Sequence, residues 1–299
     1  MDIAVVIPTR NRHEALRRCL TQIASASPEV AIVVSDDGDA AETRRILGAE
    51  FSKVNFVQGP QRGPAANRNH GAAQVSPDLY IFLDDDCIPE TSLIDAYRKV
   101  AAEMPEVGVF EGRISALGEP KGFGDCVPTN ETGGHLWSCN FAIRAGVFQE
   151  IHGFDERFVF AANEDSDIYL RAKQVAEVRF IPEARVFHHY ETRLGEKPLR
   201  HKGVSSVLYL QIHTPQVTGH NTISFLRAAA RSVLVDVPRR IRQHTTKNPF
   251  HLLRLVIYDL KLAVIMAFWK HRGTMSRLLY RPCCNGCRQM LGRIQNSSA

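Results

Sequence analysis

Apolar residues follow two patterns along the first 110 positions of the chain. Short, continuous apolar runs predict buried strands, and apolar residues that recur every three or four positions predict amphipathic helices. The expected strands are residues 3–7, 31–34, 54–57, 80–83 and 107–110. The expected helices lie near residues 16–23, 43–47, 65–75 and 93–100. Strands and helices that alternate in this way predict a three-layer α/β/α domain with a mainly parallel sheet.

Beyond residue 110 the pattern is less regular. Residues 112–134 are rich in Gly and Pro and predict a loop near the functional site. Residues 164–175 predict a helix, with Asn163 as its candidate N-cap. Two short strands are expected within residues 178–187, and two adjacent histidines follow them. Neighbouring side chains on a strand point to opposite faces, so only one of these histidines can face the site.

The most informative segment is 79–89, in which five apolar residues run directly into Asp84, Asp85 and Asp86. The apolar run predicts a strand that is buried on both faces, which places the acids at its carboxyl end, where open α/β sheets bind ligands. Three adjacent carboxylates repel one another unless a cation lies among them. Their oxygen atoms suit Mg²⁺ or Mn²⁺. The alternative is an acidic turn that caps the next helix.

Two other expected strands also end in polar loops, at residues 8–12 and 36–39. The carboxyl ends of parallel strands meet at one edge of a sheet, as a nucleotide site requires. The first loop contains no glycine, which excludes the dinucleotide-binding and Walker A glycine patterns at this place. A phosphate-bearing ligand then needs cationic side chains. The candidates are Arg10, Arg12, Arg62 and Arg68.

Charge is unevenly distributed along the 299 residues, although the net charge is only +5. Basic residues dominate positions 227–293, where Asp236 and Asp259 are the only acids. We therefore expect a catalytic domain at 1–215 and a basic, amphipathic helical region at 216–299. Such a region suits an anionic membrane surface better than nucleic acid, which predicts a cytoplasmic protein attached peripherally to the inner face of the cell membrane. The alternative is that these helices pack on the catalytic domain or form a homodimer contact.

Seven cysteines at scattered positions argue against a disulfide framework and for a reducing compartment. Cys283, Cys284 and Cys287 form one cluster, and only His271 lies near enough in sequence to add a ligand for zinc. The start of the chain lacks the basic and apolar regions of a secretory signal. These features agree with a cytoplasmic location.

Six segments occur in the order that is typical of family 2 glycosyltransferases, and each resembles one of the motifs of that family. They are Val5–Arg12, Val33–Gly38, Arg62–Gly71, Phe82–Asp86, Asn163–Arg171 and Val186–His189. Each motif is weak alone, but the six together span residues 3–189. The resemblance implies a GT-A fold, which the C-terminal helical region expected from the charge pattern would follow. It also implies an inverting transferase that uses a nucleotide-diphosphate sugar and a divalent cation.

The resemblance assigns roles to individual residues of the donor site. Pro8 and Arg10 would border the nucleoside, Asp37 would bind its base, and Asp84 would contact the ribose. Arg10 stands where the family commonly has an aromatic residue, so its contact with the base is expected to be of the cation–π type. The donor site implied in this way, with the arginine candidates included, comprises Pro8, Thr9, Arg10, Arg12, Asp37, Arg62, Arg68, Asp84 and Asp85.

The metal and the base follow from the same resemblance. Asp86 would hold Mn²⁺ or Mg²⁺ on the diphosphate, together with one of the adjacent histidines, His188 in preference to His189. Asp165 would act as the general base that removes the proton of the acceptor hydroxyl. Its neighbour Glu164 is a candidate acceptor contact. A helix cap is the alternative role for both of these acids.

The donor is expected to be a UDP- or dTDP-sugar, and the acceptor a glycan or glycolipid. Trp137 and Asn140 could contact the acceptor, although Trp137 is as easily explained as a core residue. Two other functions compete with this one. A nucleotidyltransferase is disfavoured because the first loop lacks glycine. An inactive sugar-nucleotide-binding module is disfavoured because Asp86, Asp165 and His188 are all present.

Overall fold

The computed structural model describes residues 1–48, 50–121, 125–192 and 196–213, and a few isolated positions between 230 and 260. The chain divides into two compact units, of which the first comprises Met1–Leu117, Val127–Val159 and Glu164–His189. Apart from those isolated positions, the expected basic region at 216–299, with its three-cysteine cluster, lies outside the described residues. Its helices, its membrane contact, its dimer contact and the domain boundary at 215 therefore stay predictions.

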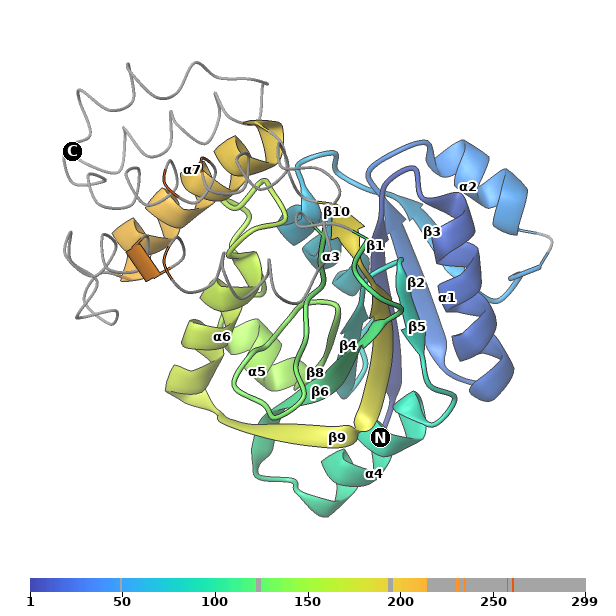
Figure 1. Cartoon of the computed structure of the whole chain (residues 1–299). Helices are drawn as coiled ribbons and strands as arrows, with labels where there is room; N and C mark the ends of the chain where they lie inside the picture. Colours follow the sequence, from blue (N-terminus) through green and yellow to red (C-terminus); the bar gives the residue numbers. More distant parts are fainter. Residues whose placement is uncertain are drawn as a thin grey trace. The chain divides into compact units, whose positions relative to one another are not determined.

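The described residues of the first unit are built on one sheet of eight strands, in the order β3-β2-β1-β4-β8-β6-β9-β5 (Figure 1). The earlier strands are β1 (Ile3–Thr9), β2 (Ala31–Asp36), β3 (Asn55–Gln58), β4 (Leu79–Leu83) and β5 (Cys87–Pro89). The later strands are β6 (Val107–Leu117), β8 (Asn140–Arg144) and β9 (Glu177–His189).

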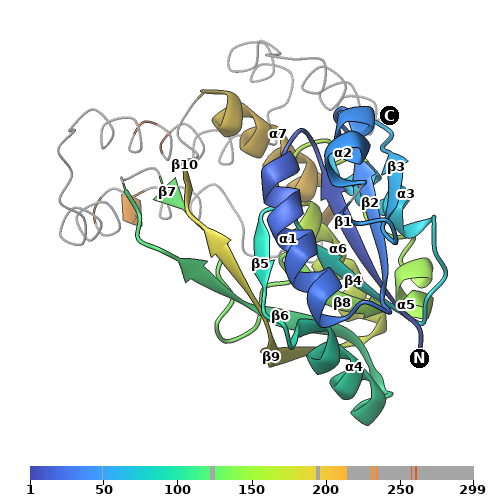
Figure 2. The same cartoon turned by 90° about the vertical axis from the view of Figure 1, so that its right-hand side faces the viewer.

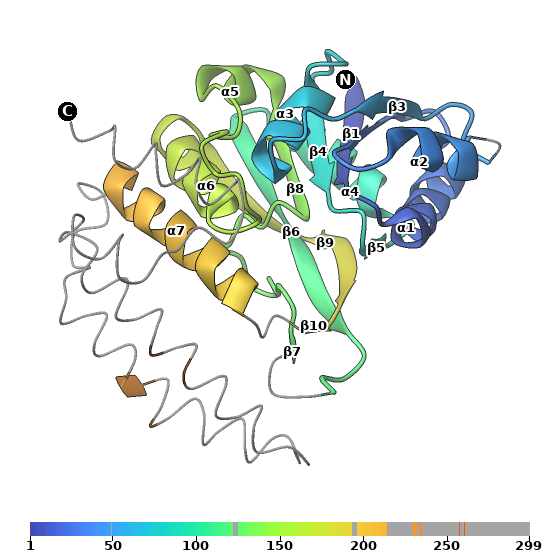
Figure 3. The same ribbon diagram turned by 90° about the horizontal axis from the view of Figure 1, so that it is seen from above.

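Helices cover both faces of this sheet, which confirms the expected three layers. On one face lie α1 (His13–Ala26), α2 (Ala40–Leu47) and α4 (Leu93–Glu103). On the other face lie α3 (Pro64–Ala72), α5 (Ala145–Glu150) and α6 (Glu164–Val175). Val5 and Ile7 pack toward the first set and Val6 toward the second. Figure 2 shows α1 in front of the strands, and Figure 3 shows α3, α5 and α6 together on one side of them.

Strand directions are parallel in the first half of the sheet and mixed in the second. β1 pairs in parallel with β2 and with β4, and β2 pairs in parallel with β3. β8 is antiparallel to both of its neighbours, β4 and β6, whereas β6 and β9 are parallel. β5 is antiparallel to β9. Antiparallel pairing enters because the described part of the connection from β6 to β8 contains no crossover helix.

Two details of the later half differ from the sequence-based expectation. Residues 112–117, which were expected in a loop, continue β6 and pair with β9. A Cβ added at Gly112 would lie 2.1 Å from Asn140 Nδ2, so this glycine allows close packing rather than a turn. The two short strands expected within 178–187 form one strand, whose pairing with β6 passes from Ile181 directly to Arg185.

The second unit contains the short antiparallel pair β7 (Asp125–Cys126) and β10 (Glu191–Thr192), and helix α7 (Glu196–His213). Within this unit the rings of Phe160 and His201 stack with their centroids 3.7 Å apart. Nowhere in the described part of the chain is a helix both long and apolar enough to cross a bilayer.

A buried polar contact ties α4 to three strands of the sheet. Asn140 on β8 donates from Nδ2 to the carbonyls of Arg113 on β6 and Ala184 on β9, at 2.9 Å each. The Tyr97 hydroxyl of α4 donates to Asn140 Oδ1, also at 2.9 Å. Both side chains are buried. The amide of Asn140 is therefore used in holding the sheet together.

Replacing Asn140 by alanine should leave two buried carbonyls and a buried hydroxyl without their partner. Each such loss costs about 1–3 kcal/mol. We therefore expect Asn140→Ala to lower the free energy of unfolding by roughly 3 kcal/mol or more, measured by urea unfolding. Tyr97→Phe removes one of the three bonds and serves as the matched control, with an expected loss of about 1 kcal/mol. Wild-type stability of Asn140→Ala would contradict this account.

Candidate active site

Asp84, Asp85 and Asp86 follow β4 and form an acidic turn, in which each side chain has a different partner. Asp84 Oδ1 lies 2.6 Å from Arg68 Nη2. Asp85 is buried and accepts a hydrogen bond from the Thr9 hydroxyl of β1 at 2.6 Å. The third, Asp86, contacts Arg12. The repulsion expected among adjacent carboxylates is thus relieved by separate contacts.

The buried Asp85 keeps a proton at higher pH than an ordinary carboxyl. Burial, followed by the charge of Asp86, raises the pKa of Asp85 to about 7. The hydrogen bond from Thr9 and the charge of Arg12, whose Nη1 is 3.4 Å from Asp85 Oδ1, act in the opposite direction. Near neutral pH, Asp85 therefore exchanges readily between its charged and neutral forms.

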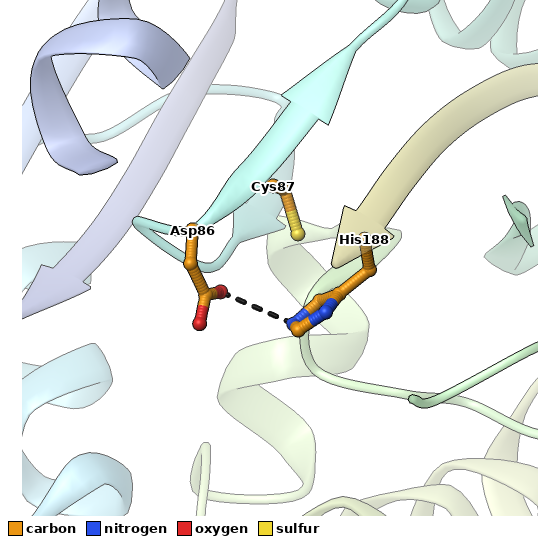
Figure 4. Close-up of side chains that lie close together, drawn as sticks. All are labelled: Asp86, Cys87 and His188. Atoms are coloured by element: carbon orange, nitrogen blue, oxygen red, sulfur yellow. Dashed lines mark ion pairs between the residues drawn. The ribbon is translucent and has the colours of Figure 1, made fainter. Parts of the chain in front are cut away.

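Asp86 and His188 face each other across β5 and β9 (Figure 4). His188 is buried and His189 is exposed, so His188 is the histidine that lies in the site. His188 Nε2 lies 3.2 Å from Asp86 Oδ1, and His188 Nδ1 lies 2.7 Å from the His189 carbonyl. A carbonyl oxygen accepts only, so Nδ1 carries a proton and Nε2 is the nitrogen that faces Asp86. Burial lowers the pKa of His188, but hydrogen bonding with Asp86 and the charge of Asp86 outweigh it and raise the pKa.

The donor atoms of this pair fit a divalent cation. Two ligand atoms that bind one octahedral Mg²⁺ at right angles, each roughly 2.1 Å from the metal, lie about 3 Å apart. The Asp86 oxygen and the His188 nitrogen have nearly this separation. Cys87 Sγ also lies within 4.8 Å of both atoms, but its thiol donates to the Cys139 carbonyl at 3.5 Å. The oxygen and nitrogen pair is therefore the better candidate for holding a metal.

The candidate base-binding residue, Asp37, organises the loop that follows β3. It is buried and accepts from the backbone N–H groups of Gln61 at 2.8 Å and Gly63 at 3.1 Å. Burial raises the pKa of Asp37, while these hydrogen bonds and the charge of Arg10 oppose the shift. The neighbouring Asp36 accepts hydrogen bonds from the Gly38 N–H at 2.6 Å and from the hydroxyl of Thr43 in α2. Contact of Asp37 with a nucleotide base stays a prediction.

The four candidate phosphate-binding arginines have different surroundings. Arg62 is exposed and pairs with Glu156 at 2.9 Å, and Arg10 is exposed on the loop after β1. Arg12 is also exposed and contacts the acidic turn. Arg68 is 3% exposed and contacts the carboxylates of Asp84 and Glu164. Three of the four therefore remain at the surface, and one is committed to the interior.

The first residues of α6 bring two more acids to this site. Glu164 is buried, with Oε1 3.4 Å from Arg68 Nη1, and its Oε2 has no hydrogen-bond partner among the described residues. Burial, and then the charge of Asp165, raises the pKa of Glu164 to about 8. Asp165 is half-buried and accepts from the Ser166 N–H at 2.7 Å. Burial also raises the pKa of Asp165.

The candidate acceptor contacts have structural partners. Trp137 is half-buried, packs against the core on the α1 face, and donates from Nε1 to the Thr129 carbonyl at 3.1 Å. Asn140 holds β6, β8 and β9 together. These contacts favour the core role that the sequence left open for Trp137. Binding of an acceptor by either residue stays a prediction.

Two structural side chains near the site were missed by sequence reasoning. Asn67 on α3 donates from Nδ2 to the carbonyls of Thr9 at 3.2 Å and Ser35 at 2.8 Å, which joins the ends of β1 and β2. Glu111 is buried in β6 and accepts from the backbone N–H of Gly134 at 2.6 Å. The usable signal for Glu111 was a lone acid within an apolar strand, because a buried carboxylate needs partners.

Comparisons with known proteins point to one family. Residues 4–124 match the model of the family described as Glycosyl transferase family 2. The pre-mycofactocin glycosyltransferase of Mycobacterium tuberculosis is 30% identical over 213 residues, which is 65% of this chain and 44% of that protein. The GalNAc(5)-diNAcBac-PP-undecaprenol beta-1,3-glucosyltransferase of Campylobacter jejuni is 30% identical over 90 residues, or 28% of this chain and 29% of that protein. The chain thus spans less than half the length of these two relatives.

Solved structures agree with this assignment at the level of the fold. Staphylococcus aureus TarS 1–349 matches with a TM-score of 0.56 at 15% identity, over 99% of this chain and 92% of that chain. The same protein in complex with UDP-GlcNAc matches with a TM-score of 0.55 at 16% identity, over the same shares of the two chains. The likeness confirms a GT-A fold. The matched segment contains the first strand and its loop, the Val33–Gly38 motif, α3 and the acidic turn, so residues 4–124 of this chain are similar to glycosyl transferase family 2.

Proposed function

We propose that this protein is an inverting glycosyltransferase that moves a sugar from a nucleotide-diphosphate sugar to a hydroxyl group of a glycan or glycolipid. Two contacts carry the proposal: Asp86 of the acidic turn faces His188, and Arg68 contacts both Asp84 of that turn and Glu164 at the start of α6. This arrangement provides a candidate metal site and a candidate base on one edge of the sheet. The TarS complexes with UDP and with UDP-GlcNAc favour UDP over dTDP as the donor nucleotide.

The donor lies, in this proposal, across the carboxyl ends of β1, β2 and β4. Pro8 and Arg10 border the nucleoside, Asp37 binds the base and Asp84 contacts the ribose. Open α/β sheets bind ligands at this edge, which supports the placement. Arg10 and Arg12 are exposed on the loop after β1, where their positive charge would attract the anionic diphosphate.

Asp86 and His188 hold the divalent cation, Mn²⁺ or Mg²⁺. When bound, the cation supplies positive charge that stabilises the diphosphate leaving group. Asp86 provides a carboxylate oxygen, and His188 provides Nε2 because the His189 carbonyl fixes its Nδ1–H. Arg12, which contacts Asp86, adds a cation beside the same charge.

Asp165 removes the proton from the acceptor hydroxyl as that oxygen attacks the anomeric carbon. A general base is most effective when its pKa is close to the working pH. Burial raises the pKa of Asp165 toward that range. Its neighbour Glu164 presents the buried Oε2, which suits a hydrogen bond to a sugar hydroxyl.

A glycan or glycolipid acceptor is supported by the relatives, one of which is named for an undecaprenol-linked substrate. A screen of purified UDP- and dTDP-sugars, with release of the nucleotide as the readout in the presence of Mn²⁺, tests the proposal. Release of UDP or dTDP that depends on Asp165 supports a transferase. Binding without turnover over the whole screen would favour a binding module instead.

The role of Asp165 can be separated from donor binding. Asp165→Asn should abolish transfer and leave the affinity for the donor within about threefold, because a base acts on the acceptor and not on the bound nucleotide. Calorimetry with UDP and a transfer assay measure the two quantities. Asp167→Asn is unsuitable as a control because Asp167 is buried, so the exposed Asp95→Asn is used. Loss of donor binding with normal turnover of the bound donor would identify Asp165 as a binding residue.

Metal dependence rests on Asp86. Asp86→Ala should lower turnover at saturating donor by at least about 100-fold, and excess EDTA should do the same to the wild-type protein, since both remove the charge that stabilises the leaving group. Mn²⁺ added back should rescue the wild-type protein and not the variant. Full turnover of the wild-type protein in EDTA would refute metal dependence.

The raised pKa of Asp85 predicts a pH-dependent effect on stability. The folded protein loses the Asp85 proton near pH 7, whereas an unfolded chain loses it near about 4. Between pH 5 and pH 8 the folded state must therefore give up a proton that the unfolded state has already lost, and this lowers its stability. Asp85→Asn has no such proton, so at pH 8 in EDTA its thermal midpoint should exceed that of the wild type. Each kcal/mol gained in the free energy of unfolding corresponds to a rise of about 2–4 °C.

At pH 5 the advantage of Asp85→Asn should be smaller, because the wild-type carboxyl is then neutral as well. Thermal unfolding at both pH values measures the difference, with Asp95→Asn on the surface of α4 as the control. An equal or larger advantage at pH 5 would show that Asp85 is not the group responsible.

A further inference from the structure

Arg68 is the only arginine that is buried in the described part of the chain. It lies on α3, in the segment Asn67–Asn69. Its Nη2 is 2.6 Å from Asp84 Oδ1 at the end of β4, and its Nη1 is 3.4 Å from Glu164 Oε1 at the start of α6. Its guanidinium carbon lies 5.4 Å from the centre of the Phe154 ring. The cation thus connects two elements that are distant in sequence.

The helix that carries Arg68 is held on both sides of it. Asn67 binds the backbone at the ends of β1 and β2. Asn69 Nδ2 donates to the Phe154 carbonyl at 2.8 Å, and the Phe154 N–H donates to Asn69 Oδ1 at 2.9 Å. These contacts fix the helix, so the guanidinium of Arg68 keeps its place between the carboxylates rather than extending toward solvent.

We propose that Arg68 is a positioning residue for the acids of the site and not a phosphate ligand: its guanidinium holds Asp84 at the end of β4 and Glu164 at the start of α6 in place. The proposal rests on the proposed function, in which Asp84 contacts the ribose and Asp165 is the base. It revises the expectation from sequence that Arg68 belongs with the cations that bind the diphosphate.

The electrostatic reason is the closeness of three acids to one buried cation. The charges of Asp84, Glu164 and Asp165 all raise the pKa of Arg68 and together outweigh the effect of burial, which lowers it. The same charge of Arg68 opposes the rise in the pKa of Glu164 and of Asp165. Without Arg68, Glu164 and Asp165 would lose the positive charge that opposes this rise, and both would bind a proton at higher pH. A protonated Asp165 cannot accept the proton of the acceptor.

The test compares Arg68→Gln, Glu164→Gln and the double variant with the wild type. Two quantities are measured: the pH dependence of kcat/KM for transfer, and the affinity for UDP with Mn²⁺ at pH 8.5 by calorimetry. Arg68→Gln should move the acidic limb of the pH profile up by about one unit or more and reduce kcat/KM at pH 6.5 by about tenfold. Its affinity for UDP should fall by less than about tenfold, because Arg68 acts on the nucleotide only through Asp84.

The double variant gives the sharper comparison. Glu164 has a pKa of about 8 and is mostly neutral at the pH of the acidic limb, so Arg68→Gln should shift that limb by about the same amount in the Glu164→Gln background as in the wild type. Arg68→Lys retains a positive charge and should keep a limb close to that of the wild type while losing the paired contacts. Should Arg68→Gln not fold, the comparison of Arg68→Lys with the double variant makes the same distinction.

Arg144→Gln is the matched control. Arg144 donates to the carbonyls of Val107, Ala101 and Met104, so its loss should lower stability and leave the acidic limb of the pH profile in place. The alternative role for Arg68 is a phosphate contact through Nε, which is buried without a hydrogen-bond partner among the described residues. A UDP affinity more than about tenfold weaker in Arg68→Gln, with an unchanged pH limb, would establish that role and overturn the proposal. Wild-type transfer itself tests the proposed function, whereas the differences between variants test only Arg68.

Discussion

Mutual repulsion among five carboxylates is the constraint on which the site depends. They are Asp84, Asp85, Asp86, Glu164 and Asp165. The structure relieves this repulsion in two ways. Two buried side chains oppose some of the negative charges: Arg68 contacts Asp84, and His188 contacts Asp86. Bound protons neutralise other carboxylates near neutral pH, because the pKa of Asp85 is raised to about 7 and that of Glu164 to about 8. An acidic cluster of this kind gains most from a ligand that brings positive charge, which is why a divalent cation fits it.

Helix α3 sets the geometry of the cluster through three consecutive side chains. Asn67 joins the ends of β1 and β2, Arg68 joins the acidic turn to α6, and Asn69 anchors the backbone of Phe154. A helix turns by about 100° for each residue, so three neighbours reach three different parts of the fold. A change in this helix is therefore expected to disturb both the donor-binding loops and the start of α6, which carries the candidate general base.

The sequence was sufficient for the parts of the fold that have a strong local pattern. β1, β2 and β4 were predicted because each is buried on both faces and reads as a continuous apolar run. The extension of β6 was missed because Gly112, which allows close packing of Asn140, resembles a loop residue. The pattern of β9 predicts two short strands because a proline interrupts it, whereas the structure has one long strand.

The chemistry of the site was predictable as a group of residues, and their individual contacts were not. Three acids after a buried strand indicated a cation, whereas only the family resemblance paired Asp86 with His188, and the structure places these two side chains 3.2 Å apart. Arg62 and Arg68 look alike in sequence, and only the fold shows that one is exposed and the other buried. The most direct measurement is crystallographic: anomalous diffraction from a crystal that contains UDP and Mn²⁺. The account predicts a manganese peak within bonding distance of Asp86 and His188 Nε2, next to the diphosphate. An ordered UDP with no manganese peak between these two residues would contradict it.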